Sequence, residues 1–340
     1  MKKLICLLFF ILTITLFICN GYIYALGNYW EEPADSQFSV KVISRFKENP
    51  IIKPRMPGLE GKDGANINGP SLIRVPDWVE NPLGRYYLYF AHHNGLYIRM
   101  AYADDLHGPW TIYKGGVLRF TQTLSKDHVA SPDIIIDDEN KEIRMYYHGK
   151  YKSMGTYSNY KQVSLIATSN NGLDFKSTID VLGPFYFRVF QYDGYYYAIA
   201  KNQEVGGILL RSKDGRTEFE KGPKILPAMR HAALLLKGDT LLIFYSMIGD
   251  TPEHIVMSEM KLTGDWSTWK PSPPRTILQP EEVYEGADLP LKKSVYGVVS
   301  QRVHELRDPA IFVEDGRVYL LYSIAGESGI AIAEIEITEN

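Results

Sequence analysis

The chain repeats one pattern of short strands five times. In each repeat an apolar strand leads through a turn into a second strand rich in tyrosine, and a third strand ends near Ser, Asp or Gly. The tyrosine-rich strands lie at residues 86–90, 145–147, 195–198, 242–245 and 319–322. A unit of this size cannot bury its own apolar faces, so successive repeats must pack on one another. Short antiparallel strands repeated around an axis predict an all-β fold, a five-bladed β-propeller.

The repeats run from about residue 66 to the end of the 340-residue sequence, which predicts one propeller domain at residues 66–340. The first four repeats end in a weak fourth strand beside an aromatic residue, whereas the fifth stops at Ile337 without one. Residues 39–43 alternate between polar and apolar types, as a strand does. We therefore interpret residues 26–65 as an N-terminal arm whose strand closes the ring; a loose arm is the alternative.

The beginning of the chain has the composition of a targeting segment. Lys2 and Lys3 precede an apolar run at residues 4–18, and small and polar residues follow. This pattern predicts a signal peptide or an uncleaved anchor at residues 1–25, and hence a secreted or cell-envelope protein. Both cysteines, Cys6 and Cys19, lie inside this segment, which excludes thiol nucleophiles and thiolate metal sites from the rest of the chain.

The overall charge limits the partners that the sequence predicts. The formal net charge is −3, so there is no polybasic surface of the kind that binds nucleic acid. We expect no nucleic-acid partner, and no membrane contact beyond the N-terminal anchor.

The first strand of each repeat begins near the axis of a propeller, where the blades meet. Four of the five starts carry an ionisable residue. They read Asn68-Gly69-Pro70-Ser71, Ala130-Ser131-Pro132-Asp133, Phe187-Arg188, Arg230-His231 and Arg307-Asp308-Pro309. Asp-Pro and Ser-Pro also start ordinary turns. Recurrence at the same place in successive repeats favours a site in which carboxylates and cations shift one another's pKa.

A long insertion, residues 271–305, separates the fourth and fifth repeats, and long loops are often functional. Inside it Glu285 follows Tyr284. A carboxylic acid partly desolvated beside an aromatic ring has a raised pKa, as a general acid needs, although an exposed loop glutamate is the alternative. The histidines show no spacing typical of metal ligands. We therefore expect no cofactor, with a metal ion in the channel as an open alternative.

Several motifs of the chain resemble those of the family 43-like glycoside hydrolases, which are five-bladed propellers. Residues 69–71 and 84–89 resemble their first blade, and residues 103–110 resemble its end. Ser131-Pro132-Asp133 resembles the start of their second blade, and Arg307-Asp308-Pro309 resembles a motif found across the five-bladed glycosidases. The similarity covers about residues 66–337 and implies an oligosaccharide or polysaccharide substrate in the central pocket.

The resemblance also implies roles for individual residues. The family uses an aspartate base on the first blade, a second aspartate that tunes it, and a glutamate acid. Asp133 matches the tuning position, and Glu285 with Gly286 resembles the acid but lies later in the chain. Gly69 stands at the position of the base, so Asp308 is our candidate for that role. The expected substrate-binding residues are Asn68, His128, Arg188, Arg230, His231 and Arg307.

The leading hypothesis is an exported glycoside hydrolase that uses carboxylate acid/base catalysis. We expect inversion of configuration, because a base displaced from the first blade leaves room for a water molecule. Gly69 motivates a first alternative, a non-catalytic glycan-binding propeller. The cations at Arg188, Arg230 and Arg307 motivate a second, a glycoside phosphorylase, and His231 could then be an unusual acid or part of a phosphate site.

Overall fold

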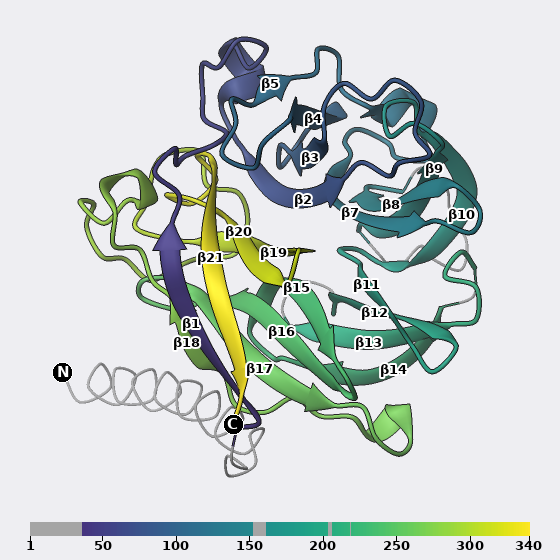
Figure 1. Cartoon of the computed structure of the whole chain (residues 1–340). Helices are drawn as coiled ribbons and strands as arrows, with labels where there is room; N and C mark the ends of the chain where they lie inside the picture. The colour runs from purple at the N-terminus through teal and green to yellow at the C-terminus, as the bar shows by residue number, and fades with distance from the viewer. Residues whose placement is uncertain (1–35, 152–160, 203–205, 218) are drawn as a thin grey trace, which may run out of the picture. The chain divides into compact units, whose positions relative to one another are not determined.

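The computed structural model describes residues 36–151, 161–202, 206–217 and 219–340. In this part of the chain the predicted strands fold as antiparallel sheets around one axis, and the predicted five-bladed β-propeller is confirmed (Figure 1). The predicted targeting segment at residues 1–25 lies outside the described residues. No helix in the described ranges is both long enough and apolar enough to cross a membrane.

Each repeat forms one sheet, and its strands follow in chain order from the axis outward. The first blade contains β2 (Asn68–Arg74), β3 (Tyr86–Ala91), β4 (Tyr97–Ala103), β5 (Thr111–Ile112) and β6 (Leu118–Arg119). The second contains β7 (Ala130–Asp137), β8 (Glu142–Gly149), β9 (Val163–Ser169) and β10 (Lys176–Pro184). The third contains β11 (Arg188–Tyr192), β12 (Tyr195–Lys201), β13 (Gly207–Ser212) and β14 (Glu220–Ile225).

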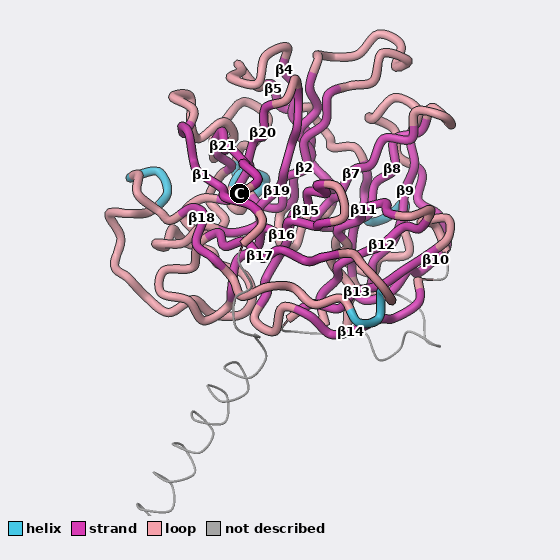
Figure 2. Tube along the Cα trace, turned by 60° about the horizontal axis from the view of Figure 1, so that its bottom comes forward, coloured by secondary structure: helices cyan, strands magenta, loops and turns pink. Residues whose placement is uncertain are grey.

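The last two blades follow the same plan. The fourth contains β15 (Met229–Lys237), β16 (Thr240–Met247), β17 (Ile255–Lys261) and β18 (Arg275–Leu278). The fifth contains β19 (Arg307–Glu314), β20 (Arg317–Ser323), β21 (Ile330–Glu339) and β1 (Phe38–Arg45). Short 3-10 helices lie in the connections (Figure 2), namely η1 (Gly61–Gly64), η2 (Phe120–Gln122), η3 (Trp266–Thr268) and η4 (Val283–Glu285).

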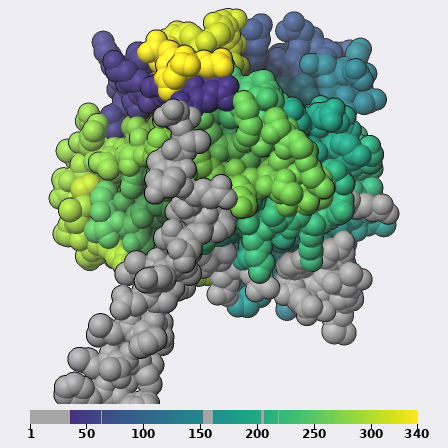
Figure 3. All heavy atoms as spheres, turned by 90° about the horizontal axis from the view of Figure 1, so that it is seen from below, coloured from purple at the N-terminus to yellow at the C-terminus, as the bar shows by residue number. Residues whose placement is uncertain are grey.

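The ring is closed by the N-terminal strand. β1 pairs antiparallel with β21, so that Val40 lies opposite Ile337 and Lys41 opposite Glu336. Figure 3 shows residues near the start of the described chain, in purple, beside residues of its C-terminal end, in yellow. The fifth repeat lacks an outermost strand of its own, and β1, from the N-terminal arm, fills that position.

The core is divided into layers between neighbouring blades. The tyrosine-rich second strands are buried, β3 along its whole length, because each blade is covered on both faces. The layer between the fifth and first blades also contains Phe46, Ile52 and Leu59. The arm that follows β1 is thus packed into the core. This packing leaves β2, β7, β11, β15 and β19 next to the axis, each in contact with its neighbours around the ring (Figure 1).

Candidate functional site

The innermost strands begin with irregular backbone. The pairing register shifts within the first residues of β2, β7, β15 and β19. Gly69, Ser131 and Asp308 lie in such shifts with φ of 59°, 51° and 47°, and Tyr186, two residues before β11, has φ of 78°. A left-handed backbone costs about 1–3 kcal/mol for residues other than glycine, and a bulge redirects a side chain. The strain is thus concentrated where the blades meet.

Side chains from four blades form one cluster at these strand starts. The ring of Tyr186 stacks on His231 with centroids 3.5 Å apart, and His231 Nδ1 contacts Asp308 Oδ1. Asp308 is buried, and it accepts hydrogen bonds from the Tyr186 hydroxyl at 3.4 Å and from Ser323 Oγ at 3.1 Å. Ser131 hydrogen-bonds to Tyr186 from the second blade. The arrangement holds a carboxylate against an imidazole in a fixed orientation.

This cluster forms part of the wall of a cavity of about 120 Å³ in the central channel. Ser131, Tyr186 and His231 line it directly, whereas Asp308 lies behind His231. The wall is rich in histidine and has one carboxylate among its lining residues. Its other charged and polar members include Asn68, His93, His128, His148, Lys150, Lys201, Arg230 and Glu327.

Glu327 is a residue that the sequence reasoning missed. It accepts hydrogen bonds from Asn66 and, at 3.2 Å, from Asn68, and it forms ion pairs with Arg307 at 3.3 Å and His93 at 3.4 Å. Burial raises the pKa of Glu327, but the His93 and Asn66 hydrogen bonds and the Arg307 charge outweigh it, so the pKa lies below its ordinary value. Glu327 is therefore an anionic group in the cavity wall.

Two histidines of the wall are held in their neutral form. Burial lowers the pKa of His148 well below its usual value, and the neighbouring charges of His128 and Arg188 lower it further. Burial likewise lowers the pKa of His231, together with the charge of Lys201. His148 Nδ1 has no hydrogen-bond partner among the described residues. Both imidazoles are therefore unprotonated at neutral pH, and each keeps the lone pair of one ring nitrogen.

Asp133 lies on β7 two residues after Ser131, and Arg188 begins β11 two residues after Tyr186. Asp133 Oδ2 accepts a hydrogen bond from the backbone N–H of Val189 at 2.9 Å, and Arg188 Nε donates to a backbone carbonyl of β15 at 3.0 Å. Burial raises the pKa of Asp133, and Arg188 opposes this. The pair joins the second, third and fourth blades behind the cavity and does not line it.

The two other arginines at the strand starts are neutralised by buried carboxylates. Arg230 lines the cavity and binds both oxygens of Glu253, at 2.6 and 2.9 Å. Arg307 is fully buried and pairs with Glu305 and Glu327. These cations support the wall more than they offer charge to a ligand.

Asn68 and His128 do line the cavity. Asn68 Nδ2 donates to Asn66 at 2.8 Å, which places it between Asn66 and Glu327. His128 lies between Asp127, at 2.6 Å, and Gln162, at 2.9 Å. Both side chains are therefore held in place by neighbours while facing the cavity.

Glu285 lies elsewhere. Its side chain is fully buried, accepts hydrogen bonds from Arg45 Nε at 2.8 Å and from the Tyr322 hydroxyl at 2.7 Å, and does not line the cavity. The insertion reaches the cavity instead through Tyr296 and Gly297. The structure therefore brings His231 and Asp308 together, with Asp133 and Arg188 behind them, and separates Glu285 from this group.

Within residues 36–151, 161–202, 206–217 and 219–340, no group of three or more His, Asp or Glu side chains is placed to hold a metal ion. The histidines of the cavity wall instead hydrogen-bond or stack on protein neighbours.

Comparisons with known proteins agree with this architecture. Solved structures with the same fold include a glycosyl hydrolase from Bacteroides ovatus (TM-score 0.63, 10% identity, covering 89% of this chain and 95% of that one). They also include a structure described under the heading that the GH130 family of mannoside phosphorylases contains glycoside hydrolases that target β-1,2 mannosidic linkages in Candida mannan. Its TM-score is 0.62 at 12% identity, and the match covers 90% of this chain and 96% of that one. A third is CoXyl43, a GH43 β-xylosidase/α-arabinofuranosidase from a compost microbial metagenome (TM-score 0.52, 14% identity, covering 84% of this chain and 94% of that one).

Sequence comparison identifies a much nearer relative. No family model matches the chain. A protein of Acanthamoeba polyphaga mimivirus, described as "Uncharacterized protein R118", is 37% identical over 329 residues, which cover 86% of this chain and 90% of the viral protein. The chain therefore belongs to the same family as the mimivirus protein R118, and it has the five-bladed β-propeller fold that glycoside hydrolases of families 43 and 130 share.

Proposed function

We propose that this chain cleaves a glycosidic bond at the central cavity, with His231 and Asp308 as its proton-transfer pair. The observation that carries this proposal is the contact of an imidazole with a buried carboxylate, at strand starts whose backbone is strained. The fold adds support, because its relatives of known structure are described as glycoside hydrolases.

The pair can act as a general base. If His231 Nδ1–H donates to Asp308, the other ring nitrogen is left as a proton acceptor. His231 is neutral at pH 7 because its pKa is lowered by burial. It can then take a proton from a water molecule that attacks the anomeric carbon, and Asp308 stabilises the imidazolium that forms. As the glycosidic C–O bond breaks, a solvent water molecule protonates the departing oxygen, and the imidazolium then returns its proton to solvent. In this proposal His231 is the base, and Asp308 orients and stabilises it instead of acting as the base itself, as the sequence had led us to expect. Inversion of configuration remains the expected outcome.

Glu327 provides the second part of the chemistry. Glycoside cleavage passes through an oxocarbenium-like transition state, which an ionised carboxylate stabilises. The lowered pKa of Glu327 keeps it ionised at neutral pH. Asp133 and Arg188 then serve as positioning residues, because they fix the strands that carry Tyr186 and His231.

The cavity size points to a small substrate group. Its volume of about 120 Å³ is below the roughly 300–1,000 Å³ of sites for drug-sized ligands. We therefore propose that it takes a single terminal sugar of an oligosaccharide. The composition of residues 1–25 supports the further proposal that this happens outside the cytoplasm.

A non-catalytic glycan-binding propeller is a second candidate. It is favoured by the single carboxylate among the lining residues, Glu327, which already makes two ion pairs. The phosphorylase alternative is weaker, because Arg230 and Arg307 are engaged by Glu253, Glu305 and Glu327.

The test is a screen of the purified protein against plant, algal and host oligosaccharides, with and without inorganic phosphate. Release of a terminal sugar without phosphate, lost in His231→Ala, is the expected result. Turnover only with phosphate would establish phosphorolysis. Binding of an oligosaccharide, without turnover of any substrate in the screen, would establish the glycan-binding alternative.

A further inference from the structure

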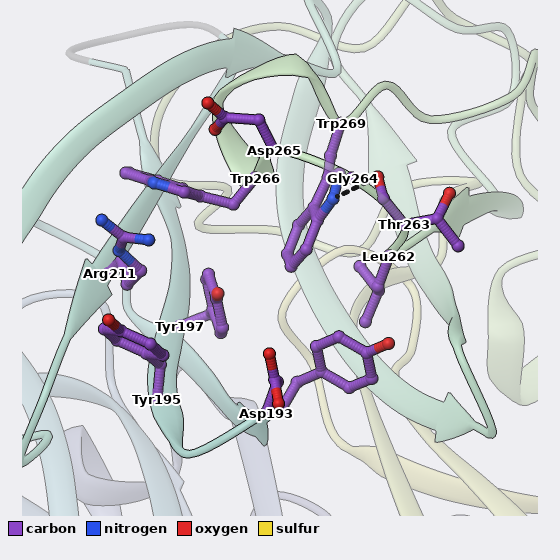
Figure 4. Close-up of a pocket in the computed structure, with 11 residues that line it drawn as sticks. Asp193, Tyr195, Tyr197, Arg211, Leu262, Thr263, Gly264, Asp265, Trp266 and Trp269 are labelled. Carbon is purple, nitrogen blue, oxygen red and sulfur yellow. Dashed lines mark hydrogen bonds between the residues drawn. The ribbon is translucent and has the colours of Figure 1, made fainter.

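A second pocket lies away from the central cavity, between the third and fourth blades. Its volume is about 660 Å³, and Figure 4 shows it as an open space between two walls. Tyr195, Arg211 and Trp266 form one wall, and Trp269 and Leu262 stand opposite. We call this space the rim pocket. It is lined by five aromatic side chains, an unusual concentration for a site outside the core.

The walls of the rim pocket are stiff. The Arg211 guanidinium lies over the rings of both Tyr195, at 4.7 Å, and Trp266, at 4.5 Å, and it pairs with Glu220 at 2.9 Å. The Trp269 indole N–H donates to a backbone carbonyl at 3.1 Å. Side chains already fixed in one orientation lose little entropy when a ligand binds.

The same place is closed at two other blade interfaces. Between the first and second blades the Tyr89 hydroxyl donates to the carbonyl of Gly172 at 2.8 Å, and between the second and third Tyr146 donates to Gly215 at 2.7 Å. In each blade the tyrosine lies opposite the residue two positions after the one with left-handed backbone. Tyr89 lies opposite Ser71, and Tyr146 lies opposite Asp133. In the third blade Ile199 lies opposite Arg188 and carries no hydroxyl, so this tyrosine hydrogen bond is absent between the third and fourth blades.

We infer that the rim pocket binds a neutral saccharide. Half-buried Tyr192 presents ring surface that suits the apolar face of a sugar. The exposed carboxylates of Asp193 and Asp265 lie at the two ends of the pocket, where they can accept hydrogen bonds from sugar hydroxyls (Figure 4). The volume is within the range of small-ligand sites.

The charges around the rim pocket select against ionic ligands. Asp193 and Asp265 repel an acidic sugar, and Arg211 in the wall disfavours an organic cation. Lys213, over the outer side of the Tyr195 ring at 3.5 Å, adds to that effect. This binding does not depend on catalysis in the central cavity, so the two proposals can fail separately.

The test is affinity electrophoresis of the full chain in native gels that contain mannan, arabinan or xylan, with polygalacturonate as the acidic comparison. We expect a neutral polysaccharide to retard the wild type. Tyr192→Ala and the conservative Asp265→Asn should each weaken the apparent affinity by about fivefold or more, because a stacked ring or a hydrogen bond is lost. Tyr102→Ala, a half-buried tyrosine of the first blade, is the matched control and should bind as the wild type does.

Three results would overturn the inference. These are no retardation by any neutral polysaccharide, retardation by polygalacturonate alone, and unchanged retardation in both rim variants. Asn68→Ala, which changes a lining residue of the central cavity, distinguishes the two sites. Retardation that survives in Asn68→Ala and is lost in Tyr192→Ala supports the rim pocket, whereas the reverse pattern assigns the binding to the central cavity and rejects the rim pocket.

Discussion

At the scale of single residues, Asp308 combines a strained backbone with a buried charge. Its φ of 47° costs energy, and its carboxylate is 1% exposed. A sequence selected for stability alone would have neither a strained backbone nor a buried carboxyl group at this position. Strain at a residue that contacts His231 is therefore best explained by the orientation that it gives to that imidazole.

We predict that Asp308→Asn lowers turnover by about 10²–10⁴-fold while shifting thermal stability little, because an amide of the same shape still accepts from Ser323 but cannot stabilise an imidazolium. The matched control is Asp315→Asn, an exposed aspartate of the same blade with φ of 50°. Steady-state kinetics and thermal unfolding of both variants decide the matter. Full activity in Asp308→Asn would remove Asp308 from the mechanism.

We predict that acid destabilises the protein through His148. Its pKa is lowered by burial, whereas histidine in the unfolded chain titrates near pH 6.5. Below about pH 6.5 the unfolded state therefore binds a proton that the folded state does not, and stability falls as pH falls, by about 1.4 kcal/mol per pH unit for one proton. His148→Gln should flatten this slope in urea unfolding between pH 6.5 and 5. An identical slope in the variant would contradict the assignment.

At the scale of elements, Glu285 joins the insertion to the strand that closes the ring. It pairs with Arg45 of β1 and accepts from Tyr322 of β20. We predict that Glu285→Gln lowers the free energy of unfolding by about 3 kcal/mol, since it removes the buried carboxylate that pairs with Arg45 and leaves this arginine only the exposed Glu281 as an ion-pair partner. Glu281→Gln is the control, because Glu281 pairs with the same arginine while 67% exposed. Loss of turnover in folded Glu285→Gln would instead restore Glu285 as a catalytic candidate.

The sequence predicted elements better than contacts. Repeated tyrosine-rich strands indicated the blades, because a strand that is covered on both faces carries large, mostly apolar side chains on both sides. The starts of the first strand of each repeat indicated His231 and Asp308 as candidates. Glu285 looked like an acid because its neighbours in sequence are an aromatic and a glycine, but Arg45, its partner, lies 240 positions away. Glu327 was missed because it follows β20 in a loop, where no periodic pattern marks it. Long-range partners, which decide the role of a carboxylate, are invisible in a local motif.

At the scale of the whole molecule, the two candidate sites differ in what the ring does for them. The central cavity needs every blade start in register, because its wall draws side chains from all five blades. The rim pocket needs only one interface between blades. Changes that loosen ring closure should therefore affect the central cavity more than the rim pocket.

This difference makes β1 the element on which the central cavity depends. A chain that begins at residue 47 lacks β1 and leaves β21 as an exposed edge, which favours pairing with other chains. We predict that this truncated chain loses turnover and associates, as size-exclusion chromatography with light scattering would show. A chain that begins at residue 36 keeps β1 and is the control. Adding a peptide of residues 36–47 should restore a monomer and part of the activity, since it can pair with β21 as β1 does. A truncated chain that stays monomeric and fully active would show that the propeller holds its cavity without this closure.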